Sequence, residues 1–280
     1  MIYNYIYLFH MPLFILLSGY CFNRDKESKK VLAGCIEDII IYVIFQASWV
    51  VLRSEYSIEQ ILTPRSTLWF LLCIPFWKLL ALTTRNIDLW LLVVCSILFS
   101  LLSGIIAKPE IVQNVFTCFF YFALGMLIRK YSILPKLRRK ELIVPSLIIM
   151  GVVFVVYYCL DLNTHRYIIG RGSFLDTATP MFLSFVTKLG FQILSVIACI
   201  CMIILTYDCK HASENGKYTL GVYLLHLFPL HIFMTVGRIF NFPQNYLFVG
   251  IYALLSVYIC LFITKTKIGK FITKPIKVNL

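Results

Sequence analysis

Histidines inside apolar runs are the residues of this chain best suited to acid–base chemistry. His10 lies in the run from Ile6 to Phe22, and His226 lies in another run that begins at Tyr218. Imidazole exchanges a proton near neutral pH without a permanent charge, so it is the least costly base to keep in an apolar segment. The alternative for each histidine is a bond to a neighbouring carbonyl and no further role. Two histidines at similar depth favour a shared polar cavity, with His10 as the first catalytic candidate and His226 as the second.

Small residues and a proline accompany His10. Ser18 offers a hydroxyl, but it lies outside a Gly-x-Ser-x-Gly context and in a predicted helix. Together with Gly19 it is better explained by close packing, since small residues let membrane helices approach one another. Pro12 removes a helical donor and predicts a bend, which often borders a cavity. We therefore expect Ser18, Gly19 and Pro12 to be structural residues near the site.

Aromatic and basic residues are the candidates for substrate contact. Trp69 and Phe70 fit either an interfacial aromatic belt or the wall of a substrate site, and Tyr223 lies three residues before His226. Arg166 and Arg171 lie in the long connection from Asp161 to Pro180. That connection is either a solvated loop or a lip that meets a polar substrate.

The composition requires that these residues be held by membrane helices. Of 280 residues, 60% are hydrophobic and only 14% are charged, more apolar surface than a soluble core of this length can bury. We predict an all-α, polytopic transmembrane bundle that forms a single domain over residues 1–280. A span needs about 20 apolar residues. The predicted spans are 2–22, 31–52, 66–83, 87–106, 112–128, 141–160, 181–205, 218–236 and 245–264.

The distribution of charge supports this count. The net charge is +13, and most Lys and Arg residues fall on alternate connections, including the stretch from Arg129 to Lys140 and the C-terminal tail. Basic connections stay in the cytoplasm, so topology explains the charge without a nucleic-acid partner. The interpretation is a multi-pass protein of the plasma or inner membrane with a cytoplasmic C-terminus and an outer N-terminus. An N-terminus outside suggests that one helix is missing upstream; the alternative is a genuine N-out protein.

Other reactive side chains give weak signals. The ten cysteines include no C-x-x-C pair and mostly lie in apolar runs, so we interpret them as small hydrophobic residues. Cys209 and His211 are too few for a metal site, and we expect neither a metal nor a bound cofactor. Lys188 falls in the seventh predicted span; either it reaches back to the membrane surface or the helix starts after it.

Three stretches resemble the acyltransferase-3 family of integral membrane O-acyltransferases. They are FHMPLFILLSGYCF from Phe9 to Phe22, LWFLLCIPFW from Leu68 to Trp77, and LGVYLLH from Leu220 to His226. The first is the most specific, and the nearest branch is that of fucose-4-O-acetylase-like and exopolysaccharide acetyltransferases. The resemblance covers nearly the whole chain and implies a ten-helix fold in the full family.

The resemblance also implies a reaction. An acyl group, usually acetyl from acetyl-CoA in the cytoplasm, would pass to a hydroxyl of a cell-surface or exported glycan at the bilayer. A midplane histidine would remove the hydroxyl proton, and basic residues such as Arg24, Lys29 and Lys30 would attract the CoA phosphates. The resemblance also implies a preceding helix with a basic residue and a histidine, and we expect this chain to lack it. His10 is then the best remaining base.

A second departure from the family is a pair of acidic residues. The family tends to be basic where this chain has CIEDII, with Glu37 and Asp38, which argues against a donor contact there. Two other functions fit the same pattern. One is a transporter or flippase of a polar substrate, and the other is an inactive, truncated family member.

Overall fold

A computed structural model describes most of the chain and shows helices throughout. The described residues are 2–53, 67–106, 109–160, 165–170, 172–176, 178–209, 214–240 and 246–267, with isolated positions between 57 and 64 and at 269. Within these ranges seven helices are long and apolar enough to cross a membrane, and two shorter apolar helices lie at Leu68–Thr83 and Leu89–Ile105. The described residues therefore confirm an all-α, multi-pass arrangement, and these helices correspond to the nine predicted spans.

Contacts among the described residues divide the chain into two compact units, each described by itself. The first unit contains the following elements: α1 (Ile2–Cys21), the start of α2 (Ser28–Arg53), α4 (Leu68–Thr83), α5 (Leu89–Leu102), η1 (Ser103–Ile105), α6 (Glu110–Lys130), α7 (Ile133–Lys136), η2 (Lys140–Leu142), α8 (Ile143–Leu160), α9 (His165–Ile168), η3 (Phe174–Asp176) and α10 (Met181–Thr206). The second contains the rest of α2 with α12 (Thr219–Leu225), α13 (Leu227–Ile239) and α14 (Tyr246–Lys265). A single domain over residues 1–280 stays a prediction.

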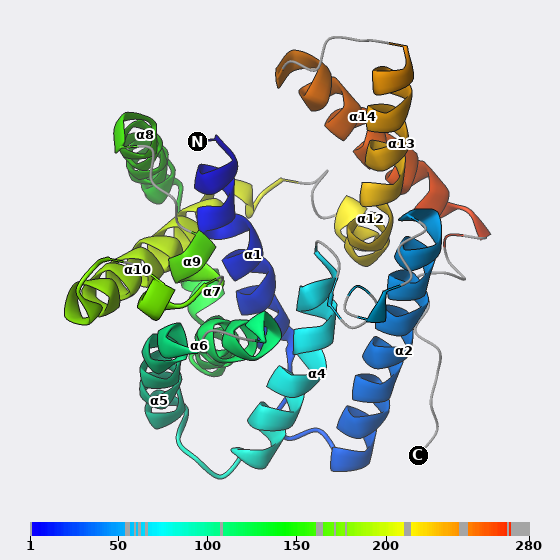
Figure 1. The fold of residues 1–280 in the computed structure, drawn as a ribbon. Coiled ribbons are helices and arrows are strands. Elements are labelled where there is room, and N and C mark those ends of the chain that lie inside the picture. Colours follow the sequence, from blue (N-terminus) through cyan, green and yellow to red (C-terminus); the bar gives the residue numbers. More distant parts are fainter. Residues whose placement is uncertain are drawn as a thin grey trace. The chain divides into compact units, whose positions relative to one another are not determined.

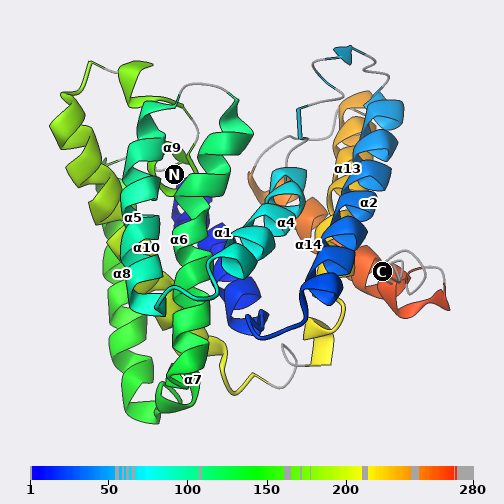
Figure 2. The same cartoon turned by 90° about the horizontal axis from the view of Figure 1, so that it is seen from below.

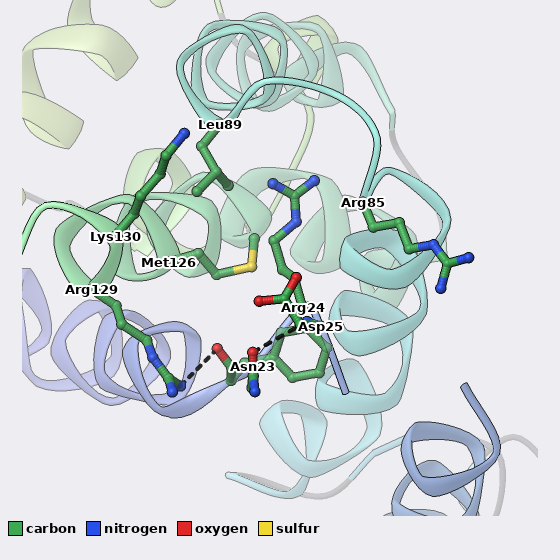
Figure 3. A pocket seen from close by; sticks show the side chains of 9 residues that line it. Asn23, Arg24, Asp25, Arg85, Leu89, Met126, Arg129 and Lys130 are labelled. Atoms are coloured by element: carbon green, nitrogen blue, oxygen red, sulfur yellow. Dashed lines mark hydrogen bonds between the residues drawn. The ribbon is translucent and has the colours of Figure 1, made fainter. Parts of the chain in front are cut away.

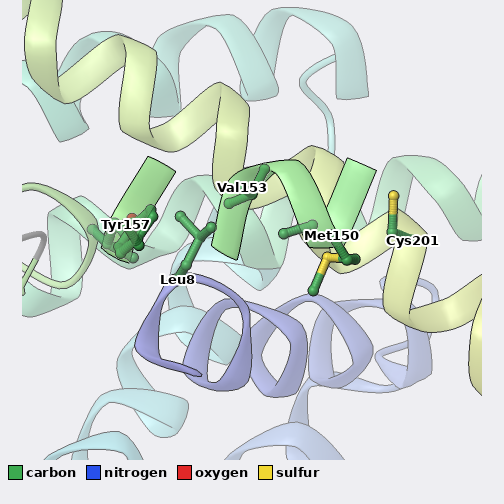
Figure 4. Packing of buried hydrophobic residues seen from close by; sticks show 7 residues of the cluster. Leu8, Met150, Val153, Tyr157 and Cys201 are labelled. Carbon is green, nitrogen blue, oxygen red and sulfur yellow. The ribbon is translucent and has the colours of Figure 1, made fainter. Parts of the chain in front are cut away.

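Helix α6 is the centre of the first unit. It packs against α1 and against α5, while α10 packs against α1 and α8 (Figures 1 and 2). Leu8 of α1 lies in an apolar cluster with Met150, Val153 and Tyr157 of α8 and Cys201 of α10 (Figure 4). Most of α6 is buried, whereas α8 exposes long apolar side chains such as those of Val144, Ile148 and Val152. An exposed apolar face suits contact with lipid.

A hydrogen bond between helices compensates for Pro12. In a continuous α-helix the N–H of residue 12 would donate to the carbonyl of Leu8, but proline has no N–H. The hydroxyl of Ser195 on α10 donates to this carbonyl at 2.6 Å. The proline therefore frees an acceptor on α1, and a serine of the neighbouring helix uses it.

The two expectations for Lys188 are both wrong. Helix α10 begins at Met181, so it includes Lys188, and the side chain is fully buried instead of reaching the surface. Its ammonium donates to the hydroxyls of Ser103 and Thr117 at 3.2 and 3.1 Å, and it lies 5.6 Å from the ring centroid of Phe174. Hydroxyl oxygens and an aromatic face thus replace water around the cation, which is why it can remain inside the bundle.

The described part of the connection before α10 is folded onto the same region. Gln113 of α6 donates to the Gly172 carbonyl at 3.0 Å, and Ser173 donates to the Ile105 carbonyl at 3.2 Å. Gly170 has φ +76°, and a Cβ there would lie 2.6 Å from the Thr117 hydroxyl. This segment is a packed part of the unit, and its glycine is required by both conformation and space.

Aromatic side chains join the helices of the second unit. Trp49 of α2 stacks on Phe228 of α13 with ring centroids 4.7 Å apart, and it meets His231 edge to face at 5.8 Å. Helices α12 and α13 both pack against α14. The hydroxyl of Tyr223 on α12 donates to the carbonyl of Thr67, which belongs to the same unit.

Candidate active site

Two cavities meet in the first unit at the C-terminal end of α1. The first, here called the arginine cavity, has a volume of about 370 Å³ (Figure 3). It is lined by Phe22, Asn23, Arg24, Asp25, Arg85, Leu89, Met126, Arg129 and Lys130. Four of these side chains are cationic and one is a carboxylate. A concave site with this excess of positive charge is suited to a phosphorylated ligand.

Backbone carbonyls hold two of the arginines in place. The Nη1 group of Arg129 on α6 donates to the carbonyls of Cys21 and Phe22, each at 3.1 Å, where α1 ends. Arg24 donates to the carbonyl of Thr84 and to that of Ile87 at 3.2 Å, where α4 ends. In Figure 3 the Arg24 guanidinium lies between the other side chains of the cavity. Burial lowers the pKa of Arg24, while Asp25 and Asp88 act in the opposite direction. Both cations are therefore positioned before any ligand arrives.

The other two cations of the arginine cavity are less constrained. Lys130 lies 3.6 Å from Asp88, and both side chains are about half exposed. The backbone N–H of Trp90 donates to Asp88, which lowers the pKa of that carboxyl and keeps it charged. Arg85 is exposed and extends to one side of the cavity in Figure 3. Because Asp88 offsets only part of this charge, the cavity keeps a positive field.

The second cavity, here called the ion-pair cavity, has a volume of about 510 Å³. It shares Phe22, Asn23 and Arg129 with the arginine cavity. Its other lining residues are Ser18, Cys21, Lys26, Lys30, Val31, Gly34, Asp38, Ile74, Lys78 and Phe122. These residues come from α1, α2, α4, α6 and the connection between α1 and α2, and they combine apolar walls with charged groups.

Asp38 is paired inside this cavity. The Lys78 ammonium lies 2.5 Å from Asp38 Oδ2, with the lysine side chain 25% exposed and the aspartate side chain 20% exposed. The sequence suggested that the acidic residues of CIEDII oppose a donor contact. For Asp38 this argument loses its basis, because Lys78 balances the carboxylate charge.

His10 lies on the side of α1 that faces away from α6 and α10. The buried residues of α1 are Leu8, Met11, Pro12, Ile15, Leu16 and Gly19. With about 100° per residue, His10 falls on the opposite side of the helix, within about 20° of Cys21. Cys21 lines the ion-pair cavity and lies eleven residues further on, or about 16 Å along the axis. The half-buried imidazole packs edge to face on Phe14, with centroids 5.2 Å apart.

The hydrogen-bond partners of His226 favour one tautomer of its imidazole. Its Nδ1 lies 2.8 Å from the Tyr223 carbonyl and 3.1 Å from the Val222 carbonyl. Since carbonyl oxygens only accept, Nδ1 carries the proton in the neutral imidazole and Nε2 keeps its lone pair. The imidazole is thus oriented by its own helix, with one nitrogen available as a base. His226 belongs to the second unit and His10 to the first, so a cavity shared by the two stays a prediction.

The remaining candidates have different surroundings. Trp69 and Phe70 are buried, and the Phe70 ring lies 5.8 Å from the ring of Trp77. The hydroxyl of Tyr223 is occupied by the backbone, as described above. Arg171 and the side chain of Arg166 lie outside the described residues. Substrate contact by these five residues stays a prediction.

The sequence did not reveal several residues of the two cavities. Of the residues expected to attract the CoA phosphates, Arg24 and Lys30 line these cavities and Lys29 does not, and their role stays a prediction. Arg85, Arg129 and Lys78 were interpreted only as topological charges. The signal in the sequence was that these residues lie at or near the ends of apolar helices, on connections that the predicted topology places on the same side of the membrane. Among the described residues, no group of three or more His, Cys, Asp or Glu side chains could hold a metal ion.

Comparison with known proteins agrees with this architecture. The family model for the acyltransferase domain, of the acyltransferase-3 type, matches residues 1–265. No curated protein and no solved structure matches the chain.

Proposed function

Because the chain belongs to the acyltransferase-3 family of membrane acyltransferases, we propose that it transfers an acyl group from acyl-CoA to a glycan hydroxyl. The donor would be acetyl-CoA, and the acceptor a cell-surface or exported polysaccharide. The arginine cavity supports this proposal, since four cationic side chains line it and acyl-CoA is a polyanion. CoA carries three phosphates, and guanidinium groups bind phosphate oxygens through paired N–H donors.

The donor would be oriented by the two adjoining cavities. Its phosphates would lie against Arg24, Arg85 and Arg129, and the arm that ends in the thioester would enter the ion-pair cavity. From there the side of α1 that carries Cys21 leads toward His10. This arrangement would direct the thioester into the bilayer, where the acceptor hydroxyl must meet it.

In the reaction the acceptor hydroxyl oxygen attacks the thioester carbonyl carbon. His10 removes the hydroxyl proton as the new C–O bond forms. The tetrahedral intermediate then collapses, the C–S bond breaks, and the CoA thiolate leaves and takes the proton from the imidazolium. No other reactant is consumed. His226, with Nε2 unprotonated, is the second candidate for this role.

The test measures thiol release and acetyl incorporation by the purified full chain in liposomes. Substrates are acetyl-CoA and de-O-acetylated surface polysaccharide. We expect His10→Ala to lower turnover by about 10²- to 10⁴-fold, the usual contribution of a general base. His231→Gln is the matched control, because this histidine also lies in an apolar helix and has no proposed role. Equal turnover of His10→Ala and the unsubstituted protein would remove His10 from the mechanism. Glycan movement without thiol release would favour a flippase.

A further inference from the structure

The charged residues of the ion-pair cavity differ in depth. Lys26 and Lys30 are exposed, and Lys30 pairs with Glu27 at the surface at 2.9 Å. Lys78 and Asp38 are mostly buried, and their partner in each case is the other. The cavity therefore has cations near solvent and a neutral pair deeper between the helices.

The deeper pair is costly for the fold. Both residues belong to apolar helices, Asp38 to α2 and Lys78 to α4, and a desolvated ion pair seldom adds net stability over well-packed apolar side chains. The two helices already have another contact there, from the Cys35 thiol to the Pro75 carbonyl at 3.7 Å. The stability of the packing therefore gives little reason for the pair, whereas its position on a cavity wall gives a functional one.

The pair also has hydrogen-bonding capacity to spare. The bond between them uses Asp38 Oδ2 and one of the three ammonium N–H groups of Lys78. A carboxylate oxygen and ammonium protons are thus held at one point of a cavity whose other walls include Val31, Ile74 and Phe122. One acceptor beside one donor complements an amide, which offers an N–H and a carbonyl. It complements a phosphate poorly, because the carboxylate would repel it.

We propose that the Asp38–Lys78 pair binds the amide-bearing pantetheine arm of the donor. This inference rests on the proposed function, since it assigns a second part of the same donor to the second cavity. Asp38 accepts from an amide N–H and Lys78 donates to an amide carbonyl, while the phosphates remain in the arginine cavity. The pair is a binding element that aligns the arm along α1 and takes no part in proton transfer.

Two fragments of the donor test the two cavities independently. Pantetheine has the arm without phosphates, and adenosine 3′,5′-bisphosphate has phosphates without the arm. Their affinities for the purified full chain are measured by calorimetry and by competition with acetyl-CoA. We expect the neutral double variant Asp38→Asn/Lys78→Met to weaken pantetheine binding at least tenfold and to leave the nucleotide within twofold. Arg85→Gln should show the opposite pattern.

Two further variants keep the test decisive. Asp38→Glu preserves both charges but displaces the carboxylate, so pantetheine binding should fall at least threefold even if the double variant does not fold. Arg139→Gln, an exposed residue outside both cavities, should bind both fragments normally. Unchanged pantetheine affinity in Asp38→Glu and in the folded double variant would overturn this inference and leave the proposed function intact. If the unsubstituted protein binds neither acetyl-CoA nor either fragment, the proposed function itself fails.

Discussion

Gly19 of α1 and Gly125 of α6 lie where their helices cross, and each glycine lies against the backbone of the other helix. A Cβ at Gly19 would overlap the carbonyl of Phe122, and a Cβ at Gly125 would overlap the carbonyl of Leu16. The helix that carries His10 and the helix that carries Arg129 therefore approach as closely as two backbones can. This crossing brings Arg129 to the C-terminal end of the helix that carries His10.

Alanine at either glycine should force α1 and α6 apart. We expect Gly19→Ala and Gly125→Ala each to destabilise the folded protein by about 1–3 kcal/mol or more, the usual cost of overpacking, because backbone atoms cannot rotate away. Thermal unfolding in detergent measures this change. Gly151→Ala and Gly190→Ala are matched controls, since a Cβ at these helical glycines meets nothing within 4 Å. Equal unfolding temperatures for the two pairs would contradict the close crossing.

The bond from Ser195 to the Leu8 carbonyl should matter because of Pro12. Ser195→Ala leaves a buried carbonyl without a donor, at an expected cost of about 1–3 kcal/mol. In Pro12→Ala, residue 12 regains an N–H for the same carbonyl, so Ser195→Ala should then cost less than half as much. A double-mutant cycle on unfolding free energies gives the coupling. Additive effects would show that the serine acts independently of the proline.

The parts of the fold that follow from periodicity and composition were predictable. Nine apolar segments give the helices, and the small residue Gly19 marks a position where membrane helices pack closely. The surroundings of Lys188 were not predictable, because they depend on Ser103, Thr117 and Phe174, which are distant in sequence. From the sequence alone, a lysine in an apolar span is expected to be too costly to bury in lipid. Its hydroxyl partners on η1 and α6 come beside it only when these elements are packed against α10.

Some features of the candidate site could also be predicted from the sequence, and others could not. The motif around His10 pointed to acid–base chemistry, whereas the arginine cavity is formed where the ends of α1, α4, α5 and α6 come together. Arg129 is placed by carbonyls of α1 more than a hundred residues earlier. The pairing of Asp38 was not predictable for a related reason, since its partner Lys78 lies forty residues away on α4. Long-range pairing of charges cannot be read from a linear pattern.

The buried ammonium of Lys188 should depend on Thr117. Thr117→Val removes one of the two hydroxyls that solvate the cation, which should destabilise the fold by about 1.5–3 kcal/mol, the usual worth of a hydrogen bond to a charged group. With Lys188→Met the charge is gone, and the same threonine substitution should cost about 1 kcal/mol or less. Unfolding free energies of the four proteins complete the cycle. If Thr117→Val costs the same in both backgrounds, the hydroxyl does not stabilise the ammonium.

Donor binding should weaken with salt through the phosphates alone. The screening length falls from about 10 Å at 0.1 M to about 3 Å at 1 M ionic strength, so the exposed Arg85 and Lys130 lose most of their attraction for a polyanion. We expect the KM for acetyl-CoA to rise several-fold over this range with little change in kcat, as for a loss of uniform binding. In Arg85→Gln the KM at low salt should already be about two- to fivefold higher, and its further rise with salt should be smaller. The acetyl thioester of pantetheine, which has no phosphate, should show a KM that does not respond to salt. A parallel rise for both donors would mean that salt acts on the protein or the acceptor, and that the arginine cavity does not hold the phosphates.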